Sequence, residues 1–235
     1  MLNEALKDIL SSTIKKERFK TMFLDRVEAG QKLAKQLLRH KETRPIVLAI
    51  PRGGVVVASE VAAALNCPLD LVIPRKIGAP NNPELAVGAV ATESTVIINK
   101  TLVESLNISR DYLRQEIEKQ LGEIKRRRRK YLGDRSLPHL RDKTVILVDD
   151  GLATGYTSLA AVKAVKEENP EKIVLAVPVA PVDALRRLQE EVDELIFLEK
   201  PEFFFAVGQF YYDFAQTTDE QVVEIMARHH QGKPR

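Results

Sequence analysis

The sequence has a single cysteine, Cys67, among its 235 residues, which excludes an internal disulfide and any cysteine-rich zinc cluster. We expect Cys67 to pack as a small buried hydrophobe, because Leu65 and Pro68 lie beside it. No segment has the about 18 to 20 uninterrupted apolar residues that a membrane span requires, since charges interrupt every candidate stretch. The N-terminal residues also lack the apolar core and cleavage site of a secretory signal. We therefore expect a soluble, cytoplasmic protein.

Neither sign of charge dominates, since 36 Lys and Arg face 33 Asp and Glu, a formal net charge of +3. Much of the excess lies in one basic run, at residues 125–130. The run ends a helical pattern of apolar residues at Leu113, Ile117, Leu121 and Ile124. We interpret it as the solvated end of a helix whose apolar stripe faces the body of the protein. No aromatic residues interleave with the arginines, so nucleic-acid binding is disfavoured.

Apolar runs alternate with helical patterns along most of the chain. Short apolar runs predict strands at residues 46–50, 69–74, 144–148, 173–177 and 195–198. Amphipathic patterns predict helices at residues 55–65, 157–166, 182–191 and 218–227. This alternation predicts an α/β fold in which a mainly parallel sheet of about five strands is covered by helices on both faces.

The two ends of the chain carry their own patterns. Residues 2–14 place apolar side chains on one helical face, and a second amphipathic helix follows with Val27, Leu33, Ala34, Leu37 and Leu38. We divide the chain into an N-terminal helical extension, residues 1–21, and a main domain, residues 22–235. Residues 229–235 are expected to be a frayed tail, which makes His229 and His230 weak metal candidates.

Residues 75–99 interrupt the alternation. Their first part, RKIGAPNNPE, is rich in proline, glycine and asparagine, and two short apolar pieces follow it. Such a sequence predicts a loop with a β-hairpin that forms a flap.

The segment VILVDDGLATGYT, residues 145–157, carries the chemistry. Its apolar residues predict a buried strand, and Asp149 and Asp150 follow at the strand end, where open α/β sheets bind ligands. The small residues and hydroxyls of GLATGYT precede a helix, so backbone N–H groups can converge on an anion. Acids for sugar hydroxyls beside a phosphate cradle suit a ribose 5-phosphate. Because side chains alternate along a strand, either the backbone leaves the pleat at the two acids or one acts through metal or water.

VILVDDGLATGYT resembles the phosphoribosyl pyrophosphate signature of type I phosphoribosyltransferases, which joins a hydrophobic run, two acids and a T-G-x-T loop. Five further segments resemble a bacterial subgroup of predicted phosphoribosyltransferases: FLDRVEAGQKLA, PRGG, RKIGAPNNPE, VPVAP and VGQFYYDFAQTTDEQV. The similarity covers nearly everything after residue 22. It implies the type I phosphoribosyltransferase fold, with a flap at residues 75–99 and a small hood at residues 199–217.

The resemblance also implies roles for single residues. Asp149 and Asp150 would hold the ribose hydroxyls and act as candidate Mg²⁺ ligands. The 5-phosphate would lie against the loop made by Gly151, Ala153, Thr154, Gly155, Tyr156 and Thr157. The pyrophosphate would bind the loop of Arg52, Gly53 and Gly54, in which family members often have a non-proline cis peptide. Arg75 and Lys76 would reach over it from the flap. The implied catalytic residues are Arg52, Lys76, Asp149 and Asp150.

The implied reaction transfers the phosphoribosyl group of phosphoribosyl pyrophosphate to a nitrogenous acceptor and releases pyrophosphate. Mg²⁺ would bind mainly to the substrate and touch the protein lightly. Ala153 stands where hypoxanthine-guanine enzymes of similar sequence have an aspartate, so a 6-oxopurine is disfavoured, while orotate, uracil, adenine and non-nucleobase acceptors stay open. The candidates for holding the acceptor are the hood aromatics, half or more of which we expect to be core or interface: Phe203, Phe204, Phe205, Phe210, Tyr211, Tyr212 and Phe214.

Two other classes of function were considered, and these residues fit one of them but not the other. A regulatory protein that senses phosphoribosyl pyrophosphate without turnover would use the same site. A nucleotide-hydrolysing protein is excluded, because no G-x-x-x-x-G-K-[ST] precedes the VILVDD strand. The expected partners are small-molecule substrates, and assembly as a homodimer stays open.

Overall fold

A five-stranded parallel sheet forms the centre of the computed structural model, which describes residues 23–135 and 138–231. The strand order is β2-β1-β6-β7-β8. The strands are β1 (Ile46–Ala49), β2 (Leu69–Leu71), β6 (Thr144–Val148), β7 (Lys172–Val179) and β8 (Glu194–Glu199). The predicted sheet is thus confirmed. The expected extension at residues 1–21, with its helix at 2–14, and residues 232–235 of the expected tail lie outside the described residues.

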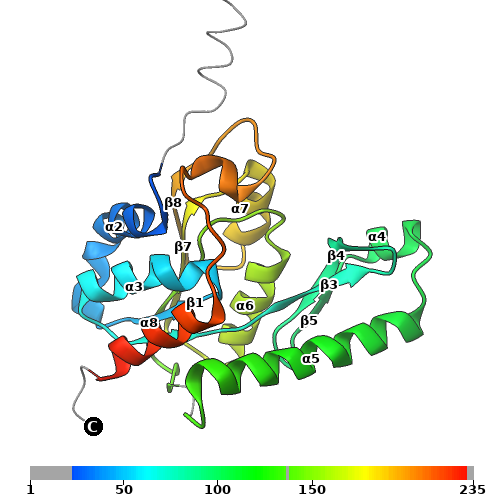
Figure 1. The fold of residues 1–235 in the computed structure, drawn as a ribbon, viewed down its shortest axis with the longest axis horizontal. Helices are drawn as coiled ribbons and strands as arrows, with labels where there is room; N and C mark the ends of the chain where they lie inside the picture. The colour runs from blue at the N-terminus through cyan, green and yellow to red at the C-terminus, as the bar shows by residue number, and fades with distance from the viewer. Residues whose placement is uncertain (1–22, 136–137, 232–235) are drawn as a thin grey trace, which may run out of the picture.

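Helices cover both faces of this sheet (Figure 1). One face packs against α2 (Arg26–Leu37), α3 (Gly53–Leu65) and α8 (Asp219–Gln231), and the other against α6 (Tyr156–Glu167) and α7 (Val182–Gln189). Because neighbouring side chains of a strand point to opposite faces, Val47 packs on the α3 side and Leu48 on the α6 side. Such double burial explains why the strands read as continuous apolar runs.

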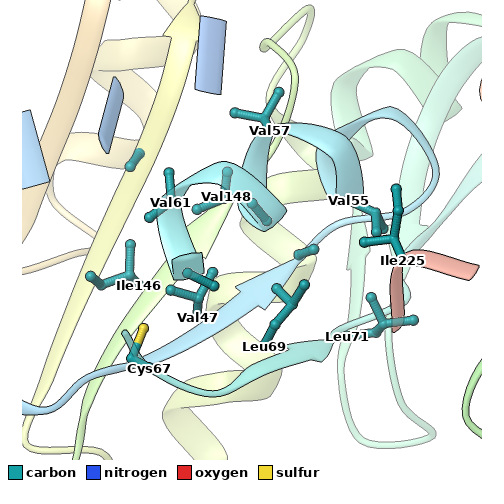
Figure 2. Close-up of a cluster of buried hydrophobic side chains, with 14 of the residues drawn as sticks. Val47, Val55, Val57, Val61, Cys67, Leu69, Leu71, Ile146, Val148 and Ile225 are labelled. Carbon is teal, nitrogen blue, oxygen red and sulfur yellow. The ribbon is translucent and has the colours of Figure 1, made fainter. Parts of the chain in front are cut away.

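Figure 2 shows the core on the α3 side, where Val55, Val61 and Ile225 meet side chains of β1 and β6. Cys67 belongs to this cluster and is 7% exposed, which confirms its expected packing role. No helix in the described part of the chain is long and apolar enough to cross a membrane.

The apolar face of α2 is the expected one at three of five residues, since Leu33, Ala34 and Leu37 are buried. It differs at Val27, which is 39% exposed, and at Leu38, which follows the helix and is 49% exposed. Gly30 accounts for the difference, because a Cβ atom there would lie 2.8 Å from the carbonyl oxygen of Val57 in α3. The close approach of the two helices selects a face centred on this glycine.

Two helix boundaries also differ from the predicted ones. Helix α3 begins at Gly53, so the second half of PRGG is its first turn and not a loop. Helix α8 continues to Gln231, so the expected frayed tail was wrong for His229 and His230, which are helical. The Oγ of Ser59 lies 2.9 Å from Nε2 of His229, a tertiary contact that extends the helix beyond its apolar pattern. Among the described residues no group of three or more His, Cys, Asp or Glu could hold a metal ion.

The predicted flap is a separate antiparallel sheet of three strands: β3 (Arg75–Ala79), β4 (Asn82–Val90) and β5 (Val96–Ile98). It projects to one side of the main sheet together with α4 (Lys100–Ser105) and α5 (Arg110–Leu132) (Figure 1). The apolar stripe of α5, including Leu113, Ile117 and Leu121, packs against Ile77 and Val87 of the flap. The expectation that this stripe faces the body was therefore wrong for most of its length, because one face of the small sheet needs its own apolar cover.

Ion pairs hold most of the basic run at the end of α5. Glu123 accepts hydrogen bonds from Arg126 and Arg127, and Lys125 pairs with Glu93 of the flap. These contacts agree with a charged helix surface whose positive charges are partly compensated within the chain. The remaining elements are two short 3-10 helices, η1 (Leu38–Thr43) and η2 (Val207–Phe210).

Candidate functional site

The two acids lie where β6 ends. Strand β6 stops at Val148, and the backbone leaves the strand at Asp149, whose Oδ1 accepts a hydrogen bond of 2.8 Å from the N–H of Asp150. Two alternatives were expected: the backbone leaves the pleat at the acids, or one acid acts through metal or water. The structure has the first, because the strand ends before Asp149. Because β1 and β6 are adjacent parallel strands, the segments that follow them meet at one sheet edge.

That meeting brings the acids into contact with PRGG. A Cβ atom on Gly53 would lie 1.8 Å from Oδ2 of Asp150, and one on Gly54 would lie 2.9 Å from Cα of Asp149. A side chain at Gly53 would have to displace the Asp150 carboxylate, and one at Gly54 would meet the backbone of Asp149. The peptide bond between Pro51 and Arg52, just before these glycines, is cis. Two motifs that are far apart in the sequence are therefore in direct contact.

A buried arginine compensates one of the acids. The side chain of Arg26 donates from Nε to Oδ2 of Asp150 at 2.7 Å, and the two side chains are only 10% and 16% exposed. Burial raises the pKa of Asp150, while the charge and hydrogen bond of Arg26 lower it. Burial and the neighbouring charge of Asp150 raise the pKa of Asp149 well above its usual range. The pair thus combines an ion-paired carboxyl with one that is costlier to ionise.

The loop from Gly151 to Thr157 curves from the acids into helix α6. Gly155 precedes the first residue of α6 with a φ of 78°, a left-handed conformation that favours glycine. Ala153 and Thr154 are exposed, so the turn of the loop faces solvent beside a helix N-terminus. The carbonyl oxygen of Thr154 accepts a hydrogen bond from Arg187 of α7, whose guanidinium lies 4.5 Å from the ring centroid of Tyr156. The geometry suits an anion that binds backbone N–H groups.

Arg52 points from PRGG toward the start of α8. Its Nη1 lies 3.4 Å from Oδ1 of Asp219. Asp219 also accepts hydrogen bonds from the hydroxyl of Tyr131 and from Nζ of Lys130, and these three donors hold its pKa far below the usual range. A strong internal counter-ion therefore orients the arginine of this loop.

The two flap cations have different surroundings. Nε of Arg75 donates to Oε1 of Gln120 at 3.0 Å, and burial followed by repulsion from Arg127 lowers the pKa of its guanidinium. Lys76 lies in the same strand, and its Nζ is 2.6 Å from Oε2 of Glu84 within the flap. The structure thus holds the half-buried Arg75 against α5 and pairs Lys76 across the hairpin.

The hood lies beside the acids and divides its seven aromatic residues in two groups. Phe204, Phe210, Tyr211 and Phe214 pack in one cluster with Phe23, and the hydroxyl of Tyr211 donates to the carbonyl oxygen of Asp150 at 2.6 Å. Burial and the charge of Asp150 raise the pKa of Tyr211. The remaining rings, Phe203, Phe205 and Tyr212, are 60%, 83% and 80% exposed. Of the rings expected to be core or interface, Phe210 and Tyr211 are buried core, and Phe204 and Phe214 are partly buried against it.

Sequence reasoning gave no role to Arg26, Asp219 or Arg187, and it placed Tyr211 among the hood aromatics without its contact to Asp150. Each contacts a predicted site residue from a distant part of the chain, and no local pattern marks such a contact. The available signal was indirect: Arg26 lies in FLDRVEAGQKLA, and Tyr211 and Asp219 lie in VGQFYYDFAQTTDEQV, two segments that took part in the resemblance.

Known proteins resemble this chain over most of its length. A family model described as a phosphoribosyl transferase domain matches residues 21–215. Proteins of Mycobacterium tuberculosis strains CDC 1551 / Oshkosh and H37Rv, both named "Putative phosphoribosyl transferase", are 39% identical over 209 residues, which is 89% of this chain and 47% of theirs. The chain therefore spans about half the length of these curated relatives. The crystal structure of TT1426 from Thermus thermophilus is 40% identical with a TM-score of 0.73, and the match covers 88% of this chain and 98% of that one.

Proposed function

Since this chain belongs to the phosphoribosyl transferase domain family and has the type I phosphoribosyltransferase fold, we propose that it binds phosphoribosyl pyrophosphate and transfers the phosphoribosyl group to a nitrogenous acceptor. One observation carries the proposal. The acids after β6 and the PRGG segment after β1 are in contact, as Gly53 and Asp150 show, so one sugar can reach both motifs.

The proposed binding mode follows the sheet edge. Asp149 and Asp150 accept hydrogen bonds from the ribose hydroxyls, and the loop of Ala153 and Thr154 surrounds the 5-phosphate with backbone N–H groups. Arg52 and the N–H groups of Gly53 and Gly54 bind the pyrophosphate. Arg75 and Lys76 add positive charge from the flap, and Lys76 would have to exchange its present partner, Glu84, for the ligand.

In the proposed reaction the bond between C1 of the ribose and the pyrophosphate oxygen breaks, and its electron pair leaves with the oxygen. The acceptor nitrogen supplies the electron pair of the new C–N bond, and a proton that it carries passes to solvent. Positive charge grows on the ring and negative charge on the leaving oxygens, so fixed opposite charges stabilise the transition state. Asp149 and Asp150 serve the ring, whereas Arg52 serves the leaving group.

The residues present suit a magnesium ion carried by the substrate. Mg²⁺ prefers oxygen ligands, keeps several waters and binds proteins through one or two carboxylates plus substrate phosphates. Asp149 and Asp150 offer such a set, and in the described residues no larger acidic cluster offers a site without substrate. Each acid keeps one oxygen for the ion, because Oδ1 of Asp149 accepts from the N–H of Asp150 and Oδ2 of Asp150 accepts from Arg26. When bound, the ion would neutralise charge on the leaving pyrophosphate.

A panel of acceptors tests the activity. The purified chain is mixed with phosphoribosyl pyrophosphate, Mg²⁺ and one nitrogenous acceptor at a time, and pyrophosphate release is measured. Release with one class of acceptor supports the transferase. Tight calorimetric binding of phosphoribosyl pyrophosphate without release under any acceptor would identify a sensor instead, and the absence of binding would refute both. A homodimer stays a prediction that the molar mass in solution would test.

A further inference from the structure

Arg26 owes its position to the segment that begins helix α2. Two hydrogen bonds join Phe23 to the hood, from its N–H to the carbonyl oxygen of Phe210 and from the N–H of Tyr212 to its own carbonyl oxygen. Asp25 then caps the helix by accepting a 2.8 Å hydrogen bond from the N–H of Glu28. The first helical residue, Arg26, is thereby fixed between the hood and the sheet edge.

The guanidinium of Arg26 makes three contacts in different directions. Its Nε donates to Oδ2 of Asp150 at 2.7 Å, and its Nη1 donates to the carbonyl oxygen of Ala215 at 2.8 Å. Its central carbon lies 3.8 Å from the ring centroid of Phe214. A planar fork that donates along two edges and stacks on a ring is a geometry that arginine provides and lysine does not.

The same pair borders the PRGG segment. A Cβ atom on Gly53 would lie 2.7 Å from Nε of Arg26, as well as 1.8 Å from Oδ2 of Asp150. Arg26 therefore touches three parts of the site: an acid of the pair, the first turn of α3 and the hood. Of these three parts, only Asp150 has an anionic side chain that can accept hydrogen bonds from a ligand.

Charge and burial explain why this position needs a cation. Two adjacent carboxylates with little exposure repel each other and lose hydration, and one buried counter-ion removes much of that cost. The pairing also commits Oδ2 of Asp150, so Oδ1 is the oxygen that it can offer to a ligand. The direction of that oxygen then depends on Arg26.

We propose that Arg26 is a positioning residue that fixes the Asp150 carboxylate for the ribose of phosphoribosyl pyrophosphate and joins it to the hood. The inference rests on the proposed function for the identity of the ligand. The coupling between Arg26 and Asp150 is independent of the proposed function, because it can be measured from the stability of the protein without a ligand.

Calorimetry with phosphoribosyl pyrophosphate and Mg²⁺ tests the role in the full chain. Replacing Arg26→Ala should weaken binding about tenfold or more, and millimolar guanidinium should restore part of it, since the added cation fills the vacated place. Arg26→Lys keeps the positive charge but not the two-edged donor geometry, so its affinity should lie between those of the parent and Arg26→Ala. Arg39→Ala removes an exposed arginine that pairs with Glu194, away from the acids, and should bind like the parent. Parent-like binding by Arg26→Ala or Arg26→Lys would overturn the role.

A double-mutant cycle separates positioning from general damage to the fold. If Arg26 acts through Asp150, Arg26→Ala should cost little further affinity in an Asp150→Asn background. Additive losses would contradict the inference. The same four proteins are compared by urea unfolding, where the two changes should again be non-additive. If the parent fails to bind phosphoribosyl pyrophosphate but the stability cycle shows coupling, the proposed function fails and the Arg26–Asp150 link stands; additivity in unfolding refutes the link itself.

Discussion

Gly53 and Asp150 are packed so closely that a Cβ atom on Gly53 would lie 1.8 Å from Oδ2 of Asp150. Gly53→Ala should therefore displace the carboxylate, lower stability and weaken phosphoribosyl pyrophosphate binding at least about tenfold. Gly122→Ala is the matched control, because a Cβ there meets nothing within 4 Å. It should stabilise α5 by about 0.5 to 1 kcal/mol and leave binding unchanged. Calorimetry and thermal unfolding of both variants measure these effects, and equal binding would contradict the contact.

Asp150→Asn and Thr154→Ala should each weaken phosphoribosyl pyrophosphate binding by about 1 to 3 kcal/mol, because each leaves polar ligand groups without a partner. The two should differ in stability. Asp150→Asn leaves Arg26 without its counter-ion and should lower the free energy of unfolding, whereas Thr154 is exposed and should be replaceable at little cost. Unchanged calorimetric affinity in both variants would refute the site assignment.

Arg187→Ala should loosen the proposed phosphate loop, because Arg187 donates to the carbonyl oxygen of Thr154 and stacks on Tyr156. We expect a loss of about 0.5 to 1.5 kcal/mol in the binding of ribose 5-phosphate. The neighbouring Arg186 is exposed and pairs only loosely, at 4.0 Å, with Asp183, so Arg186→Ala serves as the control. Equal affinities of the two variants would show that the loop does not depend on Arg187.

Phe205→Ala and Tyr212→Ala should raise the KM for the acceptor and leave the melting temperature unchanged, since these rings are 83% and 80% exposed. Phe210→Ala provides the contrast. That ring is 5% exposed, and its removal should cost about 3 kcal/mol or more of stability. Steady-state kinetics with the acceptor found by screening, together with thermal unfolding, distinguish the two effects. A KM that neither exposed ring alters would exclude them from acceptor binding.

Glu194 should make stability depend on pH. Burial raises its pKa, but hydrogen bonds from Lys172 and Arg39 and the nearby His40 lower it to about 2 from the usual 4.5. A lowered pKa in the folded state means that the carboxylate stabilises the protein above its unfolded pKa, and that this stabilisation disappears as the pH falls from about 4.5 to about 2. Glu194→Gln should therefore cost about 1 to 2 kcal/mol at neutral pH and progressively less in acid.

Urea unfolding across this pH range measures the difference between Glu194→Gln and the parent. The exposed Glu190, in the segment after α7, supplies a control, and Glu190→Gln should follow the parent at every pH. If the loss of unfolding free energy in Glu194→Gln stayed constant as the pH fell, the charge of the carboxylate would not be the cause of that loss.

Two features were readable from the sequence alone. The central sheet could be predicted because strands buried on both faces become continuous apolar runs, such as VILV before Asp149. The proposed phosphate loop could be predicted because its parts are consecutive: a strand, two acids, glycines and a helix start. Both features depend only on residues that are close together in the sequence, so composition and spacing are sufficient to predict them.

Only the tertiary structure decided which groups meet these motifs. Arg26 lies 124 residues from Asp150, and Arg52 lies 167 residues from Asp219, yet each pair is in contact. The stripe on α5 likewise shows that one face is apolar without showing that this face covers the flap. Spacing along the sequence specifies faces and turns, whereas the partner of a buried charge or an apolar stripe depends on how the whole chain packs, and no short segment contains that information.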